Sequence, residues 1–249
     1  LGIVGLAVGV AILPRLSIAV SDAGDDEDGR RALDEGVGLS MALTIPAAVA
    51  LGMIPVFLID ALFGRGAYTL DDAQMSARAL IHFAWGVPAF VLVKVLSPGF
   101  FARQDTVTPM RFALVSVVFN TVVGAGAFFW LRSQGMPGFP GLAVATSLAA
   151  WVNVMLLAIG LVAKGYYRPG PVLWSRLARV FISAVLMGGL LWLARDYRSE
   201  IESLAFNSKL LGALLVVAVG GVAYLVFAFI TGAIRPSDIR AGLRRRAKS

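Results

Sequence analysis

One lysine within a long apolar run is the residue whose surroundings most clearly suggest chemistry. Lys94 lies in the stretch FVLVKVLSPGF. An ionisable group inside a membrane helix costs about 2.5–3.5 kcal/mol on insertion scales, and it usually faces a cavity or a partner. Lys94 therefore either faces a cavity, where it pairs with an anionic group such as a pyrophosphate, or extends its ammonium group along the helix to the membrane surface.

Two arginines follow Lys94 in a short polar turn. Arg103 and Arg111 enclose the residues QDTVTPM, and their guanidinium groups are further candidates for binding an anionic substrate. A simpler interpretation treats the segment as a turn whose positive charges hold it on one side of the membrane. In that turn Pro109 lies in the first turn of the next helix, with Thr108 as its cap.

Neutral polar side chains lie within two later apolar runs. Asn120 and Thr146 each offer an oxygen atom, and hard cations such as Na⁺ prefer oxygen ligands. Hydrogen bonding between neighbouring helices explains the same side chains, and Asn153 has the same two interpretations. Asn120 and Thr146 thus predict either a sodium site or a helix contact.

The sequence contains no set of residues suited to catalysis. It has no Cys, a single His at position 82 and no glycine-rich phosphate loop. Asp60 stands alone near the end of an apolar run, so we expect no pair of acids to share a site. We therefore predict a protein that is not an enzyme and has no cofactor other than a sodium ion.

The composition predicts an all-α bundle of membrane helices. Hydrophobic residues make up 58% and charged residues 15% of the 249 residues, and the mean hydropathy is +0.81; soluble domains average about 25% charged residues. A β-barrel shows alternating polarity over segments of about ten residues, and these runs lack it. Runs long enough to cross a bilayer core of about 30 Å occupy residues 1–20, 38–63, 79–101, 112–131, 141–163, 173–194 and 210–233.

Local features refine these seven predicted spans. The first run starts without a Met, a basic region or a cleavage site, so we expect the sequence to begin inside a membrane helix. The polar segment 21–36 is expected to add a short surface helix. Prolines at positions 46, 55 and 88 predict bends in two spans, and Thr69 and Asp72 have the spacing of a capping box.

The distribution of basic residues predicts the orientation of the chain. Alternate loops lie on opposite sides of the membrane, and one set carries fifteen Lys and Arg residues against six in the other. Because positively charged loops stay in the cytoplasm, we expect the C-terminus and the segment 21–36 on the cytoplasmic side. The same rule explains the formal net charge of +7 without a nucleic-acid partner.

Four separated motifs resemble those of a known transporter family. They are LPRLS at 13–17, LFGRGAYTLDD at 62–72, GVPAFVLVKVLSPGFFARQDTVTPMR at 86–111 and GLAVATSLAAWVN at 141–153. In order and spacing they are similar to the C-terminal half of MurJ/MviN-type lipid II flippases, which belong to the multidrug/oligosaccharidyl-lipid/polysaccharide exporter superfamily. The resemblance covers nearly the whole sequence.

The resemblance implies a domain organisation. Residues 1–163 would form the C-terminal transporter lobe, from a truncated helix 8 to helix 12 of the family. Residues 164–234 would add two membrane helices that form a lipid groove, and residues 235–249 would be a basic cytoplasmic tail. The N-terminal lobe, with the cavity arginines that engage the pyrophosphate, would be the missing partner of this lobe.

The resemblance also implies a function and a location. Such proteins move lipid II across the bacterial inner membrane by alternating access, so lipid II and membrane lipids are the expected partners. Asn120 and Thr146 would lie at the sodium site of some family members, although Gly124 stands where an acidic residue is expected. A related polysaccharide or drug exporter of the same superfamily, or a membrane scaffold that transports nothing, are the alternatives.

Overall fold

The protein is described by a computed structural model that covers residues 26–64, 68–204 and 208–233, together with Val10, Leu13, Leu16 and Gly66. Every element of secondary structure in this part of the chain is a helix, as the composition predicts. The helices are α2 (Asp26–Met53), α3 (Pro55–Phe63), α4 (Leu70–Ala84), α5 (Val87–Leu96), α6 (Pro98–Phe101), α7 (Val107–Ser133), α8 (Phe139–Ala163), α9 (Pro171–Ala194), η1 (Arg195–Tyr197), α10 (Arg198–Leu204) and α11 (Lys209–Ile230).

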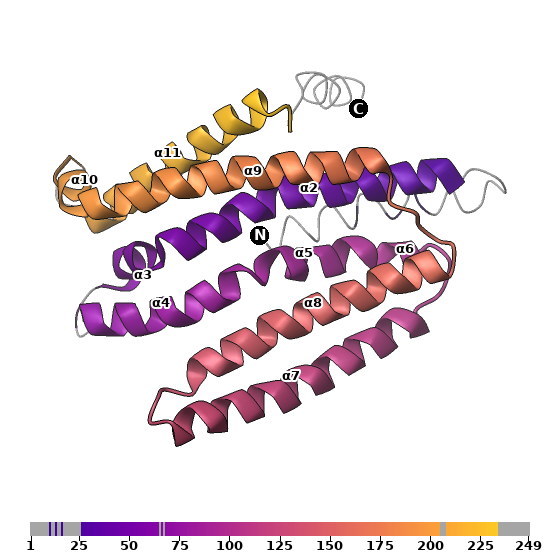
Figure 1. Ribbon diagram of the computed structural model, residues 1–249, viewed down its shortest axis with the longest axis horizontal. Coiled ribbons are helices and arrows are strands. Elements are labelled where there is room, and N and C mark those ends of the chain that lie inside the picture. The colour runs from indigo at the N-terminus through magenta and orange to yellow at the C-terminus, as the bar shows by residue number, and fades with distance from the viewer. Residues whose placement is uncertain are drawn as a thin grey trace.

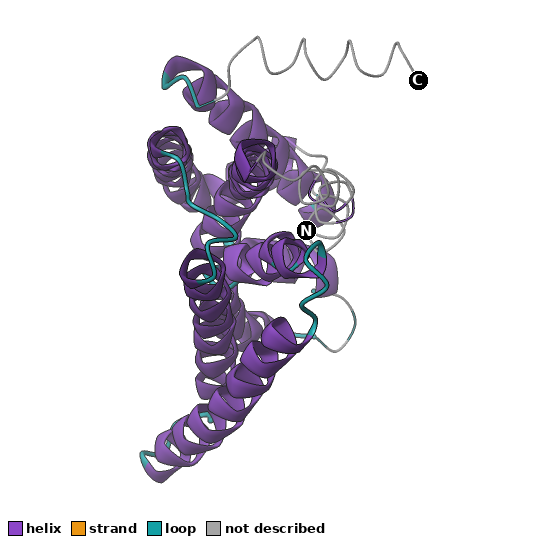
Figure 2. Ribbon diagram, turned by 90° about the vertical axis from the view of Figure 1, so that its right-hand side faces the viewer, coloured by secondary structure: helices purple, strands orange, loops and turns teal. Residues whose placement is uncertain are grey.

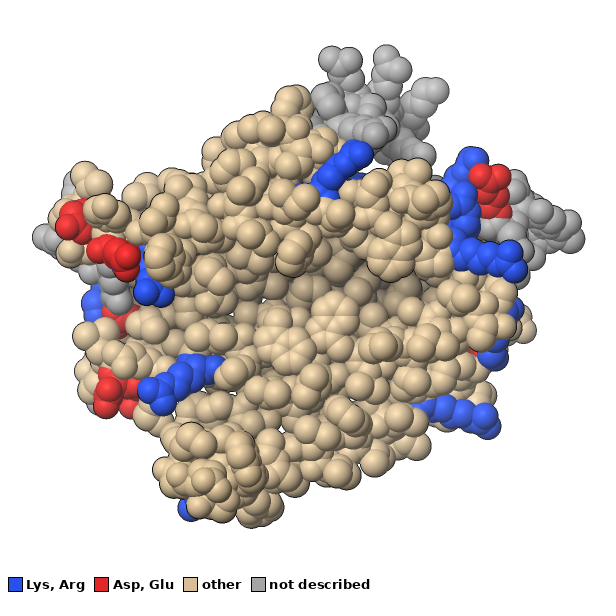
Figure 3. Space-filling model, in the orientation of Figure 1, with Lys and Arg blue, Asp and Glu red and all other residues tan. Residues whose placement is uncertain are grey.

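Six stretches of the described residues are long and apolar enough to cross a membrane. They are Glu27–Met53, Leu70–Phe101, Val107–Ser133, Phe139–Ala163, Pro171–Tyr197 and Lys209–Ile230. Six of the seven predicted spans are therefore confirmed as helices of the required length, and the first, at 1–20, lies almost wholly outside the described residues. Charged side chains gather mostly towards the two ends of the molecule, with an uncharged band between them (Figure 3).

The prediction for the polar segment 21–36 is wrong in one respect. Its described part is not a separate surface helix, because α2 runs without a break from Asp26 to Met53. Leu33 and Val37 are buried, whereas Glu27 and Arg31 are exposed. One face of the segment packs against the bundle, so its helix continues beyond the apolar run.

Proline and glycine interrupt two of the long spans. α2 ends at Met53 and α3 begins at Pro55, while α5 follows Gly86 with Pro88 in its first turn. A proline removes one helix hydrogen bond and its ring collides with the preceding turn, so these two breaks confirm the predicted bends. Pro46 instead lies inside α2, which continues through it.

The helices pack around α2 and α8. α2 contacts α9, α5 and α4, whereas α8 contacts α7, α5 and α4, and α11 lies against α9 and α3. Figures 1 and 2 show the result: α2, α9 and α11 form one group, and α5, α8 and α7 form a second group beside it. One cluster of buried apolar side chains joins α2 to α5 and α8, and a second joins α2 and α3 to α9 and α11.

Gly86 allows α8 to approach closely at the break between α4 and α5. A Cβ atom added at Gly86 would overlap the hydroxyl oxygen of Ser147 and come within 2.8 Å of the Ser147 Cβ. Ser147 donates a 2.7 Å hydrogen bond to the carbonyl of His82, and the Trp151 indole donates a 3.0 Å bond to the carbonyl of Trp85. These two bonds from α8 satisfy carbonyl groups beside the interrupted helix.

The turn before α4 confirms another prediction. The Thr69 hydroxyl accepts a hydrogen bond from the backbone N–H of Asp72, and the Asp72 carboxylate accepts one from the backbone N–H of Thr69. This reciprocal pair is a capping box, and it fixes the residue at which α4 begins.

Candidate functional site

Three basic side chains meet where α6 ends, α7 begins and α8 ends. The Arg103 guanidinium lies over the ring of Tyr166, 4.5 Å from its centre, and the Lys164 ammonium lies 5.7 Å from the centre of the same ring. Arg111 is exposed in the first turns of α7, and its charge acts on Lys164. We call Arg103, Arg111 and Lys164 the basic cluster. Its first two members are predicted from the sequence, and Lys164 is a member that the sequence did not single out.

Asp105 links the basic cluster to the start of α7. Its carboxylate accepts a 2.6 Å hydrogen bond from Lys164, a 3.0 Å bond from the backbone N–H of Thr108 and a 2.8 Å bond from the Thr108 hydroxyl. The bond from Lys164, followed by those from Thr108, lowers the pKa of Asp105 from 3.8 to about 2. The bond to Asp105 in turn raises the pKa of Lys164, so both groups are charged at neutral pH.

These bonds correct the predicted helix cap. Pro109 lies in the first turn of α7, as expected, but Thr108 does not cap the helix, because α7 already begins at Val107. The residue in the cap position, Thr106, makes no side-chain capping bond. The Asp105 carboxylate takes over that role, because it accepts a hydrogen bond from the backbone N–H of Thr108. The helix dipole also favours a negative charge at this end of α7.

Lys94 lies in the last turn of α5. Its side chain is exposed, whereas Val95 and Leu96 beside it are buried. The ammonium group therefore lies outside the packed interior of this chain, near the helix end where the dipole favours a cation. Substrate binding by Lys94, Arg103 and Arg111 stays a prediction.

The structure brings together the two polar residues predicted from later spans. The Thr146 hydroxyl lies 3.4 Å from Asn120 Oδ1 and donates a 2.9 Å bond to the Leu142 carbonyl. Asn120 and Thr146 line a hollow of about 400 Å³ between α7 and α8, whose described lining includes Gly124 and no carboxylate. A hard cation takes about six oxygen ligands, more than this pair offers, so sodium binding here stays a prediction.

The third polar residue of these spans has different surroundings. Asn153 lines a hollow of about 260 Å³ together with Ser97 and Pro109. Its Oδ1 atom is buried and has no hydrogen-bond partner among the residues that the structure describes. The helix contact predicted for this side chain is therefore not made by its amide oxygen.

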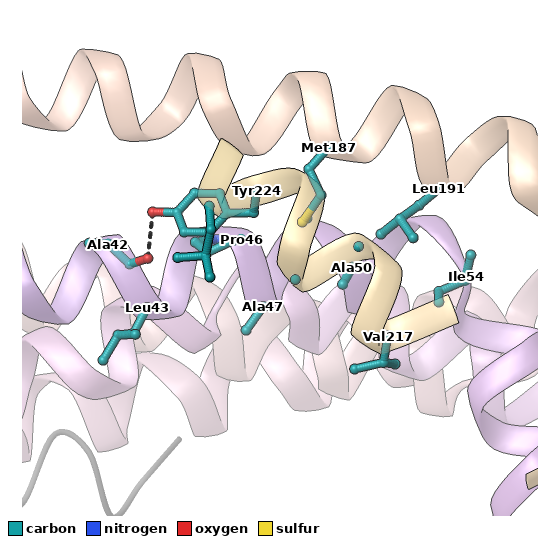
Figure 4. A pocket seen from close by; sticks show the side chains of 13 residues that line it. Ala42, Leu43, Pro46, Ala47, Ala50, Ile54, Met187, Leu191, Val217 and Tyr224 are labelled. Carbon is teal, nitrogen blue, oxygen red and sulfur yellow. Dashed lines mark hydrogen bonds between the residues drawn. The ribbon is translucent and has the colours of Figure 1, made fainter. Parts of the chain in front are cut away.

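The last two long helices line an apolar hollow with α2. The hollow has a volume of about 330 Å³, and Figure 4 shows Met187 and Leu191 of α9 above Val217 of α11. The Tyr224 hydroxyl closes one end by donating a 2.6 Å hydrogen bond to the Ala42 carbonyl. We call it the α2–α9–α11 hollow; its use as a lipid groove stays a prediction.

Asp60 has a basic partner that the sequence did not single out. Its side chain is only 2% exposed, and its carboxylate accepts a 3.1 Å hydrogen bond from the ammonium group of Lys209 at the start of α11. At the other end of α11 the hydroxyl of Thr231 lies 2.9 Å from that of Ser183 in α9. Polar contacts thus fix α11 at both ends, which matters in lipid because apolar helix surfaces gain little by associating there.

A second carboxylate that the sequence did not single out holds the loop between α8 and α9. Asp34 of α2 accepts hydrogen bonds from the Tyr167 hydroxyl and the backbone N–H of Gly170, and it pairs with Arg30 at 3.3 Å. Burial, together with the bond to Asp34, raises the pKa of Tyr167 well above its usual value. Asp34 therefore binds the loop to α2.

Comparison with known proteins identifies the family of the chain. A family model described as lipid II flippase MurJ matches residues 1–212. The chain belongs to the MurJ family. A probable lipid II flippase MurJ of Rhizobium tropici is 32% identical over 255 residues, which cover 99% of this chain and 45% of that protein. One from Vibrio cholerae is 33% identical, over 97% of this chain and 44% of that protein.

A solved structure has the same fold. It is titled lipid II flippase MurJ, inward closed conformation, and it superimposes with a TM-score of 0.65 at 19% identity, covering 92% of this chain and 43% of that one. The MurJ resemblance and the membrane helix bundle predicted from the sequence are both confirmed. The chain spans about half the length of the MurJ relatives it matches.

Proposed function

We propose that the chain forms the C-terminal half of a transporter that moves lipid II across the bacterial cytoplasmic membrane by alternating access. The match to the MurJ family model over residues 1–212 supports this proposal most directly. The six apolar helices that can span a membrane are consistent with it. An N-terminal lobe on the same chain completes the transporter, and substrate binds between the two lobes.

The positive charges of this half have two roles in the proposal. Lys94, exposed on α5, faces the cavity between the lobes and pairs with the pyrophosphate of lipid II. The basic cluster lies on the cytoplasmic side, with the C-terminus, because most Lys and Arg residues lie in that set of loops. There Arg103 and Arg111 attract the anionic headgroup before it enters.

The apolar surfaces act on the other part of the substrate. The polyprenyl chain lies along the α2–α9–α11 hollow, whose described lining is almost entirely apolar. Burying apolar chain there keeps it out of the polar cavity that the headgroup crosses. Sodium binding at Asn120 and Thr146 is a separate prediction on which these steps do not depend.

Complementation with the full-length protein tests the proposal. Cells depleted of their own copy are supplied with wild type, Lys94→Ala, Lys94→Arg or the control Arg78→Ala, which removes another exposed cation from a membrane helix. We expect Lys94→Ala to leave lipid II in the inner leaflet and stop growth, and Lys94→Arg to restore part of the transport because it keeps the charge. Full growth with Lys94→Ala would show that Lys94 does not bind the substrate.

The same cells distinguish the transporter from the other classes of protein. Depletion of a lipid II transporter blocks wall synthesis and accumulates the precursor on the inner leaflet. Depletion of a drug exporter or a scaffold leaves the precursor distributed as before, and that result would contradict the proposed function itself.

A further inference from the structure

A groove separates α8 from α9 along one face of the bundle. α8 packs on α5, α4 and α7, whereas α9 packs on α2 and α11, and there is little direct contact between α8 and α9. In Figure 1 α9 lies in front of α2 and α8 lies below α5, and Figure 3 shows this face hollowed along its middle. Because α8 and α9 pack on different helices, the described part of the chain leaves apolar surface between them uncovered.

The inner part of the groove is an apolar hollow of about 540 Å³. Trp151 of α8 and Phe181 of α9 stand on its two sides, with Gly52 of α2 and Pro88 of α5 among its other lining residues. Phe181 remains 58% exposed. We call this the tail hollow, and its size suits part of one acyl chain.

A second hollow lies beside the loop that joins α8 to α9. It has a volume of about 380 Å³ and is lined by Glu27, Arg30, Gly165, Tyr166, Tyr167 and Arg168. We call it the head hollow. Tyrosine and arginine side chains together are typical of the headgroup region of a membrane.

The head hollow carries one positive charge that nothing described offsets. The guanidinium of Arg30 pairs with Asp34 at 3.3 Å and lies 3.4 Å from Glu27, whose carboxylate also pairs with Arg31 at 2.8 Å. Arg168 is exposed, and its side chain makes no hydrogen bond or ion pair with any residue in the described ranges. An arginine at this level attracts an anionic lipid with about 1 kcal/mol and binds phosphate with two parallel hydrogen bonds.

The distance between the two hollows matches the length of one lipid. Trp151 comes twelve residues before the end of α8 at Ala163, which is about 18 Å along the helix, and Phe181 comes ten residues after the start of α9 at Pro171, which is about 15 Å. Half of a bilayer core is about 15 Å thick. A headgroup at Arg168 therefore places its acyl chains at the level of the tail hollow.

We propose that the groove between α8 and α9 binds one anionic glycerophospholipid, with its phosphate at Arg168 and an acyl chain in the tail hollow. This lipid is not the transported substrate, and its site is separate from the α2–α9–α11 hollow. It fills the gap between two helices that do not support each other directly, and so it acts as a fixed part of the fold.

Native mass spectrometry of the full-length protein, titrated with phosphatidylglycerol or phosphatidylcholine of identical acyl chains, tests the site. We expect phosphatidylglycerol to bind more tightly because it carries a net negative charge, and Arg168→Gln to weaken its binding about fivefold and that of phosphatidylcholine, which has a phosphate but no net charge, by less. The matched control is Arg132→Gln, which removes an exposed arginine at the opposite end of the spans.

Gly52→Leu tests the tail hollow separately. A Cβ atom at Gly52 meets no atom within 4 Å, so the new side chain fills the hollow without disturbing α2 and weakens the binding of both lipids. Gly126→Leu is its control, because Gly126 on α7 is equally open and lies far from the groove in sequence and fold. Equal binding of the two lipids by wild type, or no difference between either variant and its control, would overturn the proposal.

Discussion

Gly86→Ala should be among the most destabilising single-methyl changes in this chain. The added Cβ would overlap the Ser147 hydroxyl, come within 2.8 Å of the Ser147 Cβ and lie 3.1 Å from its Cα. Because the last of these atoms belongs to the backbone of α8, rotation of a side chain does not relieve the collision, and α8 must move away. Overpacking of this kind costs about 1–3 kcal/mol.

A further loss follows from that movement. Ser147 also donates the 2.7 Å bond to the His82 carbonyl, and breaking a buried hydrogen bond costs about 1 kcal/mol. The expected loss for Gly86→Ala is therefore about 2–4 kcal/mol. Gly126→Ala is the control: nothing lies within 4 Å of its added Cβ, and alanine favours a helix interior by up to about 1 kcal/mol over glycine.

The measurement is an unfolding titration of the full-length protein in mild detergent, repeated in a double-mutant cycle with Ser147→Gly. Ser147→Gly removes the two atoms that lie closest to the Cβ added at Gly86. The substitution should therefore lower the stability when made alone, but restore part of the stability of the Gly86→Ala variant. Strictly additive losses, or a Gly86→Ala variant as stable as Gly126→Ala, would refute the steric argument.

Three further predictions concern polar contacts between distant segments. Lys209→Met should lower the stability of the full-length protein by about 1–3 kcal/mol in the same titration, because the Asp60 carboxylate, 2% exposed, loses its ammonium partner; charge reversal at both positions should recover part of the loss. Tyr224→Phe should cost about 0.5–1.5 kcal/mol, since it removes one buried hydrogen bond and leaves the ring in place. The Asp105 carboxylate should contribute fully to the stability of the folded protein above pH 4, and this contribution should disappear as the pH falls towards 2, because the pKa of Asp105 is lowered to about 2 in the folded protein. The free energy of unfolding measured against pH should show this loss in acid for wild type and much less of it for Lys164→Gln.

The membrane helices were predictable because their signal is local. Runs of apolar residues give the spans, and Pro55 and Pro88 give their breaks, since each effect acts within one or two helical turns. The start of α2 was missed because the local signal there is polar: residues 26–36 are rich in charge. Leu33 in this segment is buried by tertiary packing, which the local sequence does not show.

The candidate site was predictable only in part. Arg103 and Arg111 stood out as charges in one turn, but Lys164 joins them through Asp105, which is 59 residues away in sequence. Asp60 and Lys209 are 149 residues apart. A single sequence contains no signal for such pairs, because any of many opposite charges satisfies a carboxylate equally well until the fold selects one.

The attachment of α11 to α3 has a consequence for biosynthesis. The ribosome completes the Asp60 codon 149 residues before that of Lys209, and at about 5–20 residues per second this interval lasts about 7–30 s. Throughout that time α3 has been made, but Lys209, one of the groups that interact with its buried carboxylate, has not. Release of this segment into lipid is therefore more favourable once α11 has been made, which couples the synthesis of α11 to the maturation of a helix inserted earlier.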